Sequence, residues 1–440
     1  SGAMALSGCM VSVTETDRTP ALHAMPMAPP MAHGPIHNDD HHGAAHQTLT
    51  RDRLATLDAV MKQYVTDGKL GGAVIKIRQG GREVFSEAYG WRDREAGVAM
   101  QPDTIFRIAS QTKALTSVSI MMLMEEGKLV LEDPVSKFLP EWEKTTVAVA
   151  NPKAKGGYDV VPAKRPITIR DLLSHTAGVS YGTGPGEKAW RDAGIFGWYF
   201  ADKSVPVSDV VAKMAKLPMA AQPGEQWVYG YNTDILGVVV EKLSGKSLDV
   251  FFKERLIDPL GMVDTTFLPD DEQQARRASL HVKGPDGALI PLPVTRGNRP
   301  EVWSGGGGLL GTAPDYARFV RMLMGDGAGV ISPETVKGLN EIQTGDLRAG
   351  FFKPASAGTS LDFDLFPEQH TGWGLATMVT PEQGRNGRNA GTLTWAGIFN
   401  TYYWADQTAG IGGVLMTQQL PFGDPAVLEL LESLERGAYA

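Results

Sequence analysis

Phe106-Arg107-Ile108-Ala109-Ser110-Gln111-Thr112-Lys113 leads into a nearly all-apolar stretch that ends at Gly127. This pattern predicts a buried helix from Ser110 to Gly127. Ser110 and Lys113 are three residues apart, so their side chains share one helix face within hydrogen-bonding reach. Free N–H groups at a helix N-terminus favour negative charge on a nucleophile, and a lysine withdrawn from water can accept its proton. The S-x-x-K tetrad predicts a serine nucleophile, but a tetrapeptide this common needs further support.

The residues before the tetrad predict a helix and a hairpin. Apolar residues recur at helical spacing from Leu54 to Tyr64, which indicates an amphipathic helix. Strands are expected at 72–78 and 83–89, with Gly80-Gly81 forming the turn between them.

The residues after the tetrad predict helices first and strands later. Helices and loops dominate 135–345, and Thr312-Ala313-Pro314-Asp315 is typical of a helix start. Further strands are expected at 373–379, 391–394, 400–404 and 412–417, and a helix at 425–434. Strands at both ends predict one antiparallel sheet, flanked by helices, in the α+β class. The sheet lobe would comprise about 50–105 and 345–435, and a mostly helical lobe about 106–344, together a domain over 50–435.

Two later segments supply candidate partners for the tetrad. Tyr229 lies in Trp227-Val228-Tyr229-Gly230-Tyr231-Asn232, just ahead of an expected helix, in a stretch otherwise suited to packing. Thr394-Trp395-Ala396-Gly397 is followed by Ile398-Phe399-Asn400 and could line a cleft with backbone donors.

Together these motifs resemble the serine β-lactamase and penicillin-recognising superfamily, and within it the class C-like esterases called family VIII carboxylesterases. Phe106 to Lys113 looks like the first motif of that family. Tyr229-Gly230-Tyr231 stands where class C β-lactamases have Y-x-N, and Trp395-Ala396-Gly397 where they have K-T-G and the esterases often W-x-G. Further stretches agree in order and spacing: 131–135, 172–178, 258–262 and 305–312. The resemblance covers about residues 55–435 and implies a β-lactamase-like, or transpeptidase-like, fold.

The resemblance implies a role for each matching residue. Ser110 would attack a carbonyl carbon and form an acyl-enzyme, and Lys113 and Tyr229 would accept its proton. The backbone N–H groups of Ser110 and Ile398 would form the oxyanion hole. Tyr231, Trp395, Ala396 and Gly397 would contact the substrate.

Two departures from the class C pattern predict the substrate. Tyr231 replaces an Asn that would hold a lactam side chain, and Trp395 replaces a Lys that would anchor a carboxylate. Both changes make the cleft less polar. We therefore expect a serine carboxylesterase acting on neutral esters with short or medium acyl chains and with weak β-lactamase activity at most. No metal or organic cofactor is expected.

Several alternatives stay open from the sequence. The same acyl-enzyme could serve a true β-lactamase, a D-stereospecific peptidase or an acyltransferase, and the fold could also carry a catalytically silent binding protein. A different nucleophile is offered by Gly178-Val179-Ser180-Tyr181-Gly182, which matches the G-x-S-x-G elbow of α/β-hydrolases. That elbow needs a preceding strand, whereas 169–174 is expected to be helical, so Ser180 is not favoured. His175 is expected to pack in a loop.

The first 49 residues carry a separate prediction. They are rich in Pro, Met, Ala and His without periodicity, which is typical of a disordered tail. The single cysteine lies in Leu6-Ser7-Gly8-Cys9, which resembles a bacterial lipobox, although Ser1 to Met4 looks like a cloning remnant. A lipidated Cys9 would attach the protein to a membrane of the bacterial cell envelope or periplasm; without it, a cytoplasmic location is expected.

Composition excludes other functions. The 440 residues contain 42 Lys and Arg against 50 Asp and Glu, a net charge of −8, with no basic block to bind nucleic acid. One cysteine excludes intramolecular disulfides and cysteine-based zinc sites. No run of 18 apolar residues predicts a transmembrane helix. The expected partner is a small-molecule ester, and the oligomeric state is not determined by the sequence.

Overall fold

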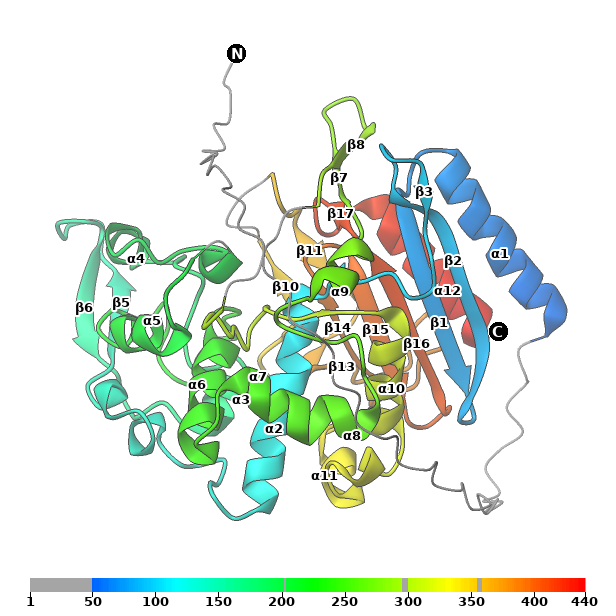
Figure 1. Cartoon of the computed structure of the whole chain (residues 1–440). Helices are drawn as coiled ribbons and strands as arrows, with labels where there is room; N and C mark the ends of the chain where they lie inside the picture. Colours follow the sequence, from blue (N-terminus) through cyan, green and yellow to red (C-terminus); the bar gives the residue numbers. More distant parts are fainter. Residues whose placement is uncertain (1–49, 202, 295–299, 354–357, 440) are drawn as a thin grey trace, which may run out of the picture. The chain divides into compact units, whose positions relative to one another are not determined.

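The central sheet of the structure has eight antiparallel strands drawn from both ends of the described chain (Figure 1). Its order is β12-β13-β14-β15-β16-β1-β2-β3. The register places Ala73 of β1 opposite Thr417 of β16. The strands are β1 (Gly72–Gln79), β2 (Arg82–Asp93), β3 (Val98–Ala99), β12 (Gly372–Trp373), β13 (Met378–Val379), β14 (Leu393–Gly397), β15 (Thr401–Asp406) and β16 (Ile411–Thr417). The α+β class with an antiparallel sheet is confirmed.

This computed structural model describes residues 50–201, 203–294, 300–353 and 358–439. The predictions for the tail, including the lipobox at Cys9, lie outside these ranges. Within them, no helix combines the length and apolar character needed to cross a membrane.

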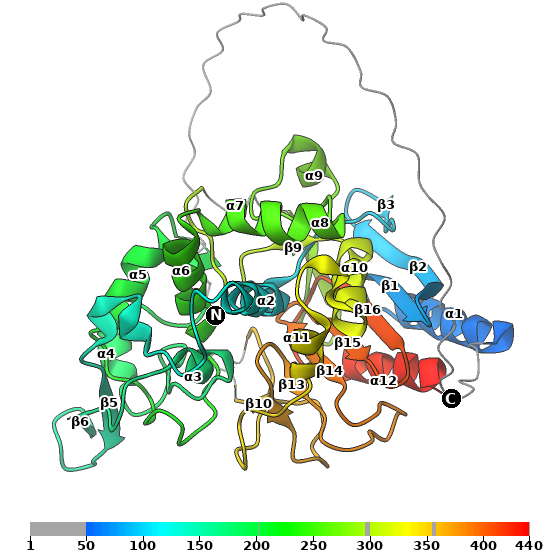
Figure 2. The same ribbon diagram turned by 90° about the horizontal axis from the view of Figure 1, so that it is seen from below.

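Helices cover both faces of the sheet (Figure 2). On one face α1 (Arg51–Thr66) packs against α12 (Pro425–Tyr439), and on the other α10 (Ala313–Met324) lies against β1, β15 and β16. Because both faces are covered, every residue of β14, β15 and β16 is buried. These strands therefore provide a rigid wall for the site. The predicted N-cap of α10 is present, since the Thr312 side chain accepts from Asp315 N.

The segment between the two halves of the sheet consists of helices and loops with several short strands. At its centre α2 (Thr112–Glu125) packs against α6 (Asn232–Ser244), and both are almost wholly buried. The other helices are α3 (Ile169–Leu173), α4 (Glu187–Asp192), α5 (Val207–Met214), α7 (Leu248–Phe252), α8 (Asp258–Leu260), α9 (Asp271–Ala275) and α11 (Pro333–Gly338). The buried helix predicted from the tetrad is present, with Ser110 in a 3₁₀ turn that leads into α2.

Some predicted strand boundaries were wrong. Residues 373–379 form two short strands instead of one, because Gly374 N donates to Thr377 O and closes a tight turn. A Cβ at Gly374 would lie 2.7 Å from Leu339 O, so the chain folds closely over its neighbour there. Several further strands were not predicted, and those with four or more residues are β5 (Thr146–Ala150), β6 (Tyr158–Pro162), β7 (Leu280–Lys283) and β8 (Leu289–Leu292). They form two short hairpins outside the central sheet.

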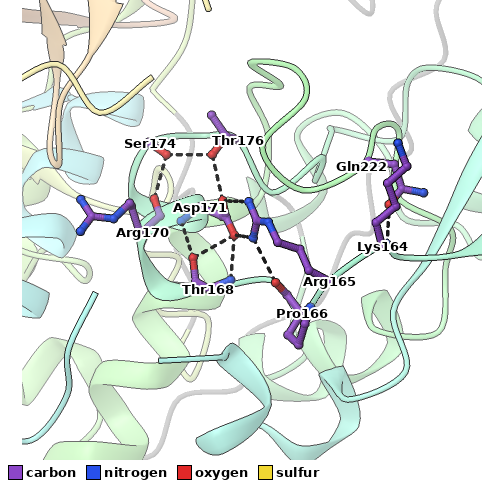
Figure 3. A network of polar contacts seen from close by, with 9 residues as sticks. All are labelled: Lys164, Arg165, Pro166, Thr168, Arg170, Asp171, Ser174, Thr176 and Gln222. Atoms are coloured by element: carbon purple, nitrogen blue, oxygen red, sulfur yellow. Dashed lines mark hydrogen bonds and ion pairs between the residues drawn. The ribbon is translucent and has the colours of Figure 1, made fainter. Parts of the chain in front are cut away.

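A buried carboxylate anchors α3, the helix that leads into the loop at His175 (Figure 3). Asp171 accepts two hydrogen bonds from the Arg165 guanidinium, at 2.5 and 2.9 Å, and one from Thr168 N at 2.9 Å. The Thr176 hydroxyl donates to it from the far side at 3.2 Å. Burial alone would raise the pKa of Asp171, but these hydrogen bonds, first from Arg165, hold it below the ordinary value of 3.8.

We expect Asp171→Asn to lower the free energy of unfolding by about 3 kcal/mol, because the amide removes the charge and turns an NH₂ group toward donors. In the wild type, the stabilisation from Asp171 should be present above about pH 4 and lost as pH falls further, since the pKa of the folded state lies below that of the unfolded chain. Urea unfolding at pH 7 and pH 3 measures both effects. The exposed Asp270→Asn at the start of α9 is the control, because Asn also caps helices well. Equal losses for the two variants would contradict the prediction.

Candidate active site

Ser110 occupies the 3₁₀ turn Ala109–Gln111 immediately before α2. Ala109 adopts a left-handed backbone conformation with φ of 45°, which is unfavourable for a residue with a Cβ. It is held there by packing against Phe399 and Leu420. The Tyr316 hydroxyl fixes the other side of the turn by donating to Gln111 O at 3.0 Å. The sharp backbone turn thus presents Ser110 at the edge of the sheet.

Lys113 lies one turn further along, with only 1% of its surface exposed. Its ammonium donates to Gly306 O at 2.6 Å, to the Tyr181 hydroxyl at 2.9 Å and to Ser110 Oγ at 3.3 Å. An ammonium has three donors, so these three neutral acceptors satisfy it fully. The predicted juxtaposition of Ser110 and Lys113 is therefore present in the structure.

Tyr181 is a member of the site that the sequence analysis missed. Its hydroxyl contacts both Lys113 and Ser110. Burial, reinforced by the negative charges that Tyr229 and Asp234 can carry, raises the pKa of Tyr181 well above its usual value. Tyr181 therefore stays a neutral phenol that can accept one proton while donating another. In the sequence it was visible only inside the G-x-S-x-G match, where nothing distinguishes it.

Tyr229 lies beside the same lysine, with its ring centroid 4.8 Å from Lys113 Nζ. Its hydroxyl accepts a 2.9 Å hydrogen bond from the Trp395 indole, which joins the second and third sequence motifs. Behind this pair is a cluster of rings: His175, Trp227 and Trp373. The cluster excludes water from one side of Tyr229 and fixes its orientation.

The end of β14 comes into close contact with the residues before Ser110. A Cβ at Gly397 would lie 2.3 Å from Ile108 O, so glycine is required for this approach. Ile398, the next residue, lines the same cavity as Ser110. The two backbone N–H groups expected to form an oxyanion hole thus belong to segments that meet at one place.

A cavity of about 740 Å³ opens above Ser110. Its wall is mainly aromatic: Tyr181, Phe196, Trp198, Trp227, Tyr229, Phe351, Trp395 and Phe422. Arg191 and Lys353 add positive charge to the lining, although Arg191 also pairs with Glu187. A cavity of this size and character suits a small organic ligand with few polar groups.

The structure revises the expectation for two predicted substrate contacts. Tyr231 is 1% exposed, donates to Gly197 O at 2.8 Å and lines a separate small cavity of about 60 Å³ rather than the large one. Its ring stacks on Trp190, so it supports the wall from behind. Gly397 is likewise outside the large cavity and acts as the close-approach residue described above. Trp395 and Ala396 do line the cavity.

The alternative nucleophile Ser180 belongs to a tight turn. Its hydroxyl accepts from Gly182 N and Thr183 N and donates to Thr183 O at 2.9 Å. The nearest preceding regular element is the helix α3 and not a strand, so the geometry of a nucleophile elbow is absent among the described residues. His175 is buried and contacts the Asn232 amide, and burial followed by the charge of Lys113 keeps its pKa well below 6.5.

Comparison with known proteins identifies the family of this chain. A family model described as Beta-lactamase matches residues 57–435. The chain belongs to the Beta-lactamase family. This Beta-lactamase family member shares 34% identity over 380 residues with Protein Rv1367c of Mycobacterium tuberculosis, covering 82% of this chain and 89% of that protein.

Two further proteins similar to this Beta-lactamase family member are described as enzymes. Esterase EstB of Burkholderia gladioli is 28% identical over 384 residues, covering 82% of this chain and 90% of that protein. The solved structure of EstCE1, described as a hydrolase with promiscuous acyltransferase activity, is 25% identical with a TM-score of 0.72, covering 88% and 99% of the two chains. The fold is therefore the β-lactamase-like fold, in a family with esterase and acyltransferase members.

Proposed function

We propose that this protein is a serine carboxylesterase that hydrolyses neutral esters with short or medium acyl chains. The observation that carries the proposal is the 3.3 Å contact between Lys113 Nζ and Ser110 Oγ at the wall of an aromatic cavity. Lys113 is 1% exposed, and its nitrogen lies directly against the serine oxygen, which places it to take part in proton transfer.

In the acylation step, Ser110 Oγ forms a bond to the ester carbonyl carbon. This step uses Lys113 as the neutral amine, whose lone pair accepts the Ser110 proton directly or through the Tyr181 phenol, which contacts both groups. The carbonyl oxygen becomes negatively charged and is stabilised by the N–H groups of Ser110 and Ile398, each worth about 10²–10³ in rate. The carbon–oxygen bond to the alcohol then breaks, and the alcohol leaves with a proton returned from Lys113 or Tyr229.

Deacylation uses the same groups in reverse. Tyr229 and Lys113 accept a proton from a water molecule as its oxygen attacks the acyl carbon. The bond to Ser110 Oγ breaks, the serine regains its proton, and the carboxylic acid product leaves. The Trp395 indole holds the Tyr229 oxygen in place through both steps.

Residue chemistry at the cavity supports neutral esters over carboxylate-bearing lactams. Trp395 stands where class C β-lactamases carry a cation, and it offers a buried ring and one N–H that is already bonded to Tyr229. A charged hydrogen bond to a substrate carboxylate, worth about 1.5–3 kcal/mol, is not available at that position. The aromatic wall favours the apolar part of an ester instead.

Side-by-side kinetics test this proposal. We expect kcat/KM for p-nitrophenyl butyrate to exceed that for nitrocefin by about 10²-fold, which corresponds to the missing charged contact. A fluorophosphonate should label the wild type once, at Ser110, as located by peptide mass spectrometry. Comparable turnover of nitrocefin would favour a β-lactamase, and absence of both turnover and labelling would favour a silent binding protein.

The size of the cavity favours acyl transfer as a second candidate. About 740 Å³ is more than a butyryl group fills, so an alcohol could occupy the remaining space next to the acyl-enzyme. EstCE1, with a similar fold, is described as having acyltransferase activity. Adding an alcohol such as benzyl alcohol to the assay distinguishes the two fates: benzyl butyrate would show transfer, and butyrate alone would show hydrolysis.

A further inference from the structure

A second buried charge lies behind the candidate active site. Asp234 is in the first turn of α6, is 2% exposed and does not line the large cavity. It has therefore no evident contact with a substrate. Its contacts instead lead toward Lys113.

The Asp234 carboxylate holds a glycine-rich turn. Asp234 Oδ1 accepts from Ser304 Oγ at 2.5 Å and from Gly306 N at 3.1 Å. Gly306 O in turn accepts from Lys113 Nζ at 2.6 Å. A single residue thus connects the carboxylate to the ammonium, through its N–H on one side and its C=O on the other.

Two glycines of this turn are required because the turn lies very close to α6. A Cβ at Gly306 would lie 2.3 Å from Asp234 Oδ2, and one at Gly305 would lie 2.6 Å from Thr233 O. The turn can therefore pack against α6 only without side chains. This explains the glycines at 305 and 306, and a Cβ at Gly308 would lie 2.7 Å from the Phe267 ring.

Asp234 also acts on its surroundings through its charge. Burial raises the pKa of Asp234, and the charge of Lys113 and the hydrogen bonds from Ser304 and Gly306 oppose that rise. The titratable side chains that face Lys113 from the other elements are Tyr181, Tyr229 and His175. Among these three side chains and Asp234, the carboxylate belongs to Asp234.

We propose that Asp234 is a positioning residue for the reaction at Ser110: it fixes the Gly306 carbonyl that receives one N–H of Lys113, and it places a carboxylate behind the Lys113 ammonium. When one N–H of Lys113 is held by Gly306 O, the other two N–H bonds are directed at Ser110 and Tyr181. After Lys113 loses a proton, its lone pair takes the place of one of these two bonds. The inference rests on the proposed function, because it assigns Asp234 a role in that same proton transfer.

The test is Asp234→Asn, which preserves shape but removes charge, assayed with p-nitrophenyl butyrate over a pH range. We expect kcat to fall about 10²-fold because the lysine is less well placed, with KM within about twofold because Asp234 lies outside the cavity. We also expect the acidic limb of the kcat/KM profile to move to lower pH, because the variant removes a negative charge close to the reacting groups.

Two further variants make the result decisive. Asp209→Asn alters an exposed first-turn acid on α5 and should leave both kcat and the acidic limb unchanged. Ser304→Ala keeps the charge but loses one hydrogen bond, so kcat should fall about 10-fold with an unmoved limb. A lowered kcat with an unmoved limb in Asp234→Asn would make the residue merely structural and overturn the proposal. If that variant does not fold, a Ser304→Ala kcat within twofold of wild type overturns it.

Labelling separates this inference from the proposed function. If a fluorophosphonate does not label Ser110 in the wild type, the proposed esterase is wrong, and the role of Asp234 falls with it. If Ser110 is labelled and Asp234→Asn behaves as the wild type, only the inference about Asp234 is wrong.

Discussion

Ser110→Ala should abolish ester hydrolysis, lowering kcat/KM for p-nitrophenyl butyrate by at least about 10⁴-fold. Alanine removes the oxygen that forms the acyl-enzyme, whereas the Tyr181 phenol, which also accepts a hydrogen bond from Lys113, is a much weaker candidate for that role. Initial rates and fluorophosphonate labelling of the purified variant measure the loss. Its stability should change little, because Ser110 is only partly buried.

Ser180→Ala is the matched control for that experiment. Its hydroxyl closes a turn through Gly182 and Thr183, so the substitution should cost about 1–2 kcal/mol of stability and leave labelling of Ser110 intact. Activity that survives in Ser110→Ala and disappears in Ser180→Ala would transfer the nucleophile to the G-x-S-x-G motif and refute our assignment.

Lys113→Met should lower the activity without lowering the stability of the fold. Methionine has a similar length and no charge, so we expect kcat/KM to fall about 10³-fold through loss of the proton acceptor. The free energy of unfolding should stay equal or rise by about 1–2 kcal/mol, because a buried ammonium held by three neutral acceptors is replaced by an apolar chain. Kinetics and urea unfolding of the same preparation measure both.

Lys76→Met provides the comparison. Lys76 lies on β1 and is also buried, with 7% exposure, but it forms an ion pair with Glu83 at 3.1 Å. This variant should retain wild-type activity. A large loss of stability in Lys113→Met, accompanied by inactivity, would indicate that the lysine holds the fold together and would count against its proposed role as a base.

Much of the site could be predicted because its signals are local. Ser110 and Lys113 are three residues apart on one helix, so helical geometry alone places them together. The order of strands at both ends and helices between them was enough to predict the antiparallel sheet. Tyr229 and Trp395 were expected in the site from motif resemblance, and the structure joins them by a hydrogen bond.

The remainder depends on contacts between distant segments. Tyr181 reaches Lys113 across 68 residues of sequence, and nothing in its neighbourhood distinguishes it from a packing tyrosine. The same limit applies to Tyr231, whose predicted place in the cleft came from a motif position and not from its burial behind the wall. The single strand predicted at 373–379 was wrong because the turn at Gly374 forms against Leu339, a partner remote in sequence.

The pairing of β1 with β16 has a consequence for biosynthesis. The two strands are about 340 residues apart, so β16 emerges from the ribosome long after β1. At about 5–20 residues per second, β1 waits roughly 20–70 seconds with one edge unpaired, which exposes the nascent chain to aggregation and to chaperones. Ser110 is synthesised early, whereas the strands β14 to β16 follow about 280 or more residues later. The candidate site can therefore assemble only after these strands have emerged from the ribosome.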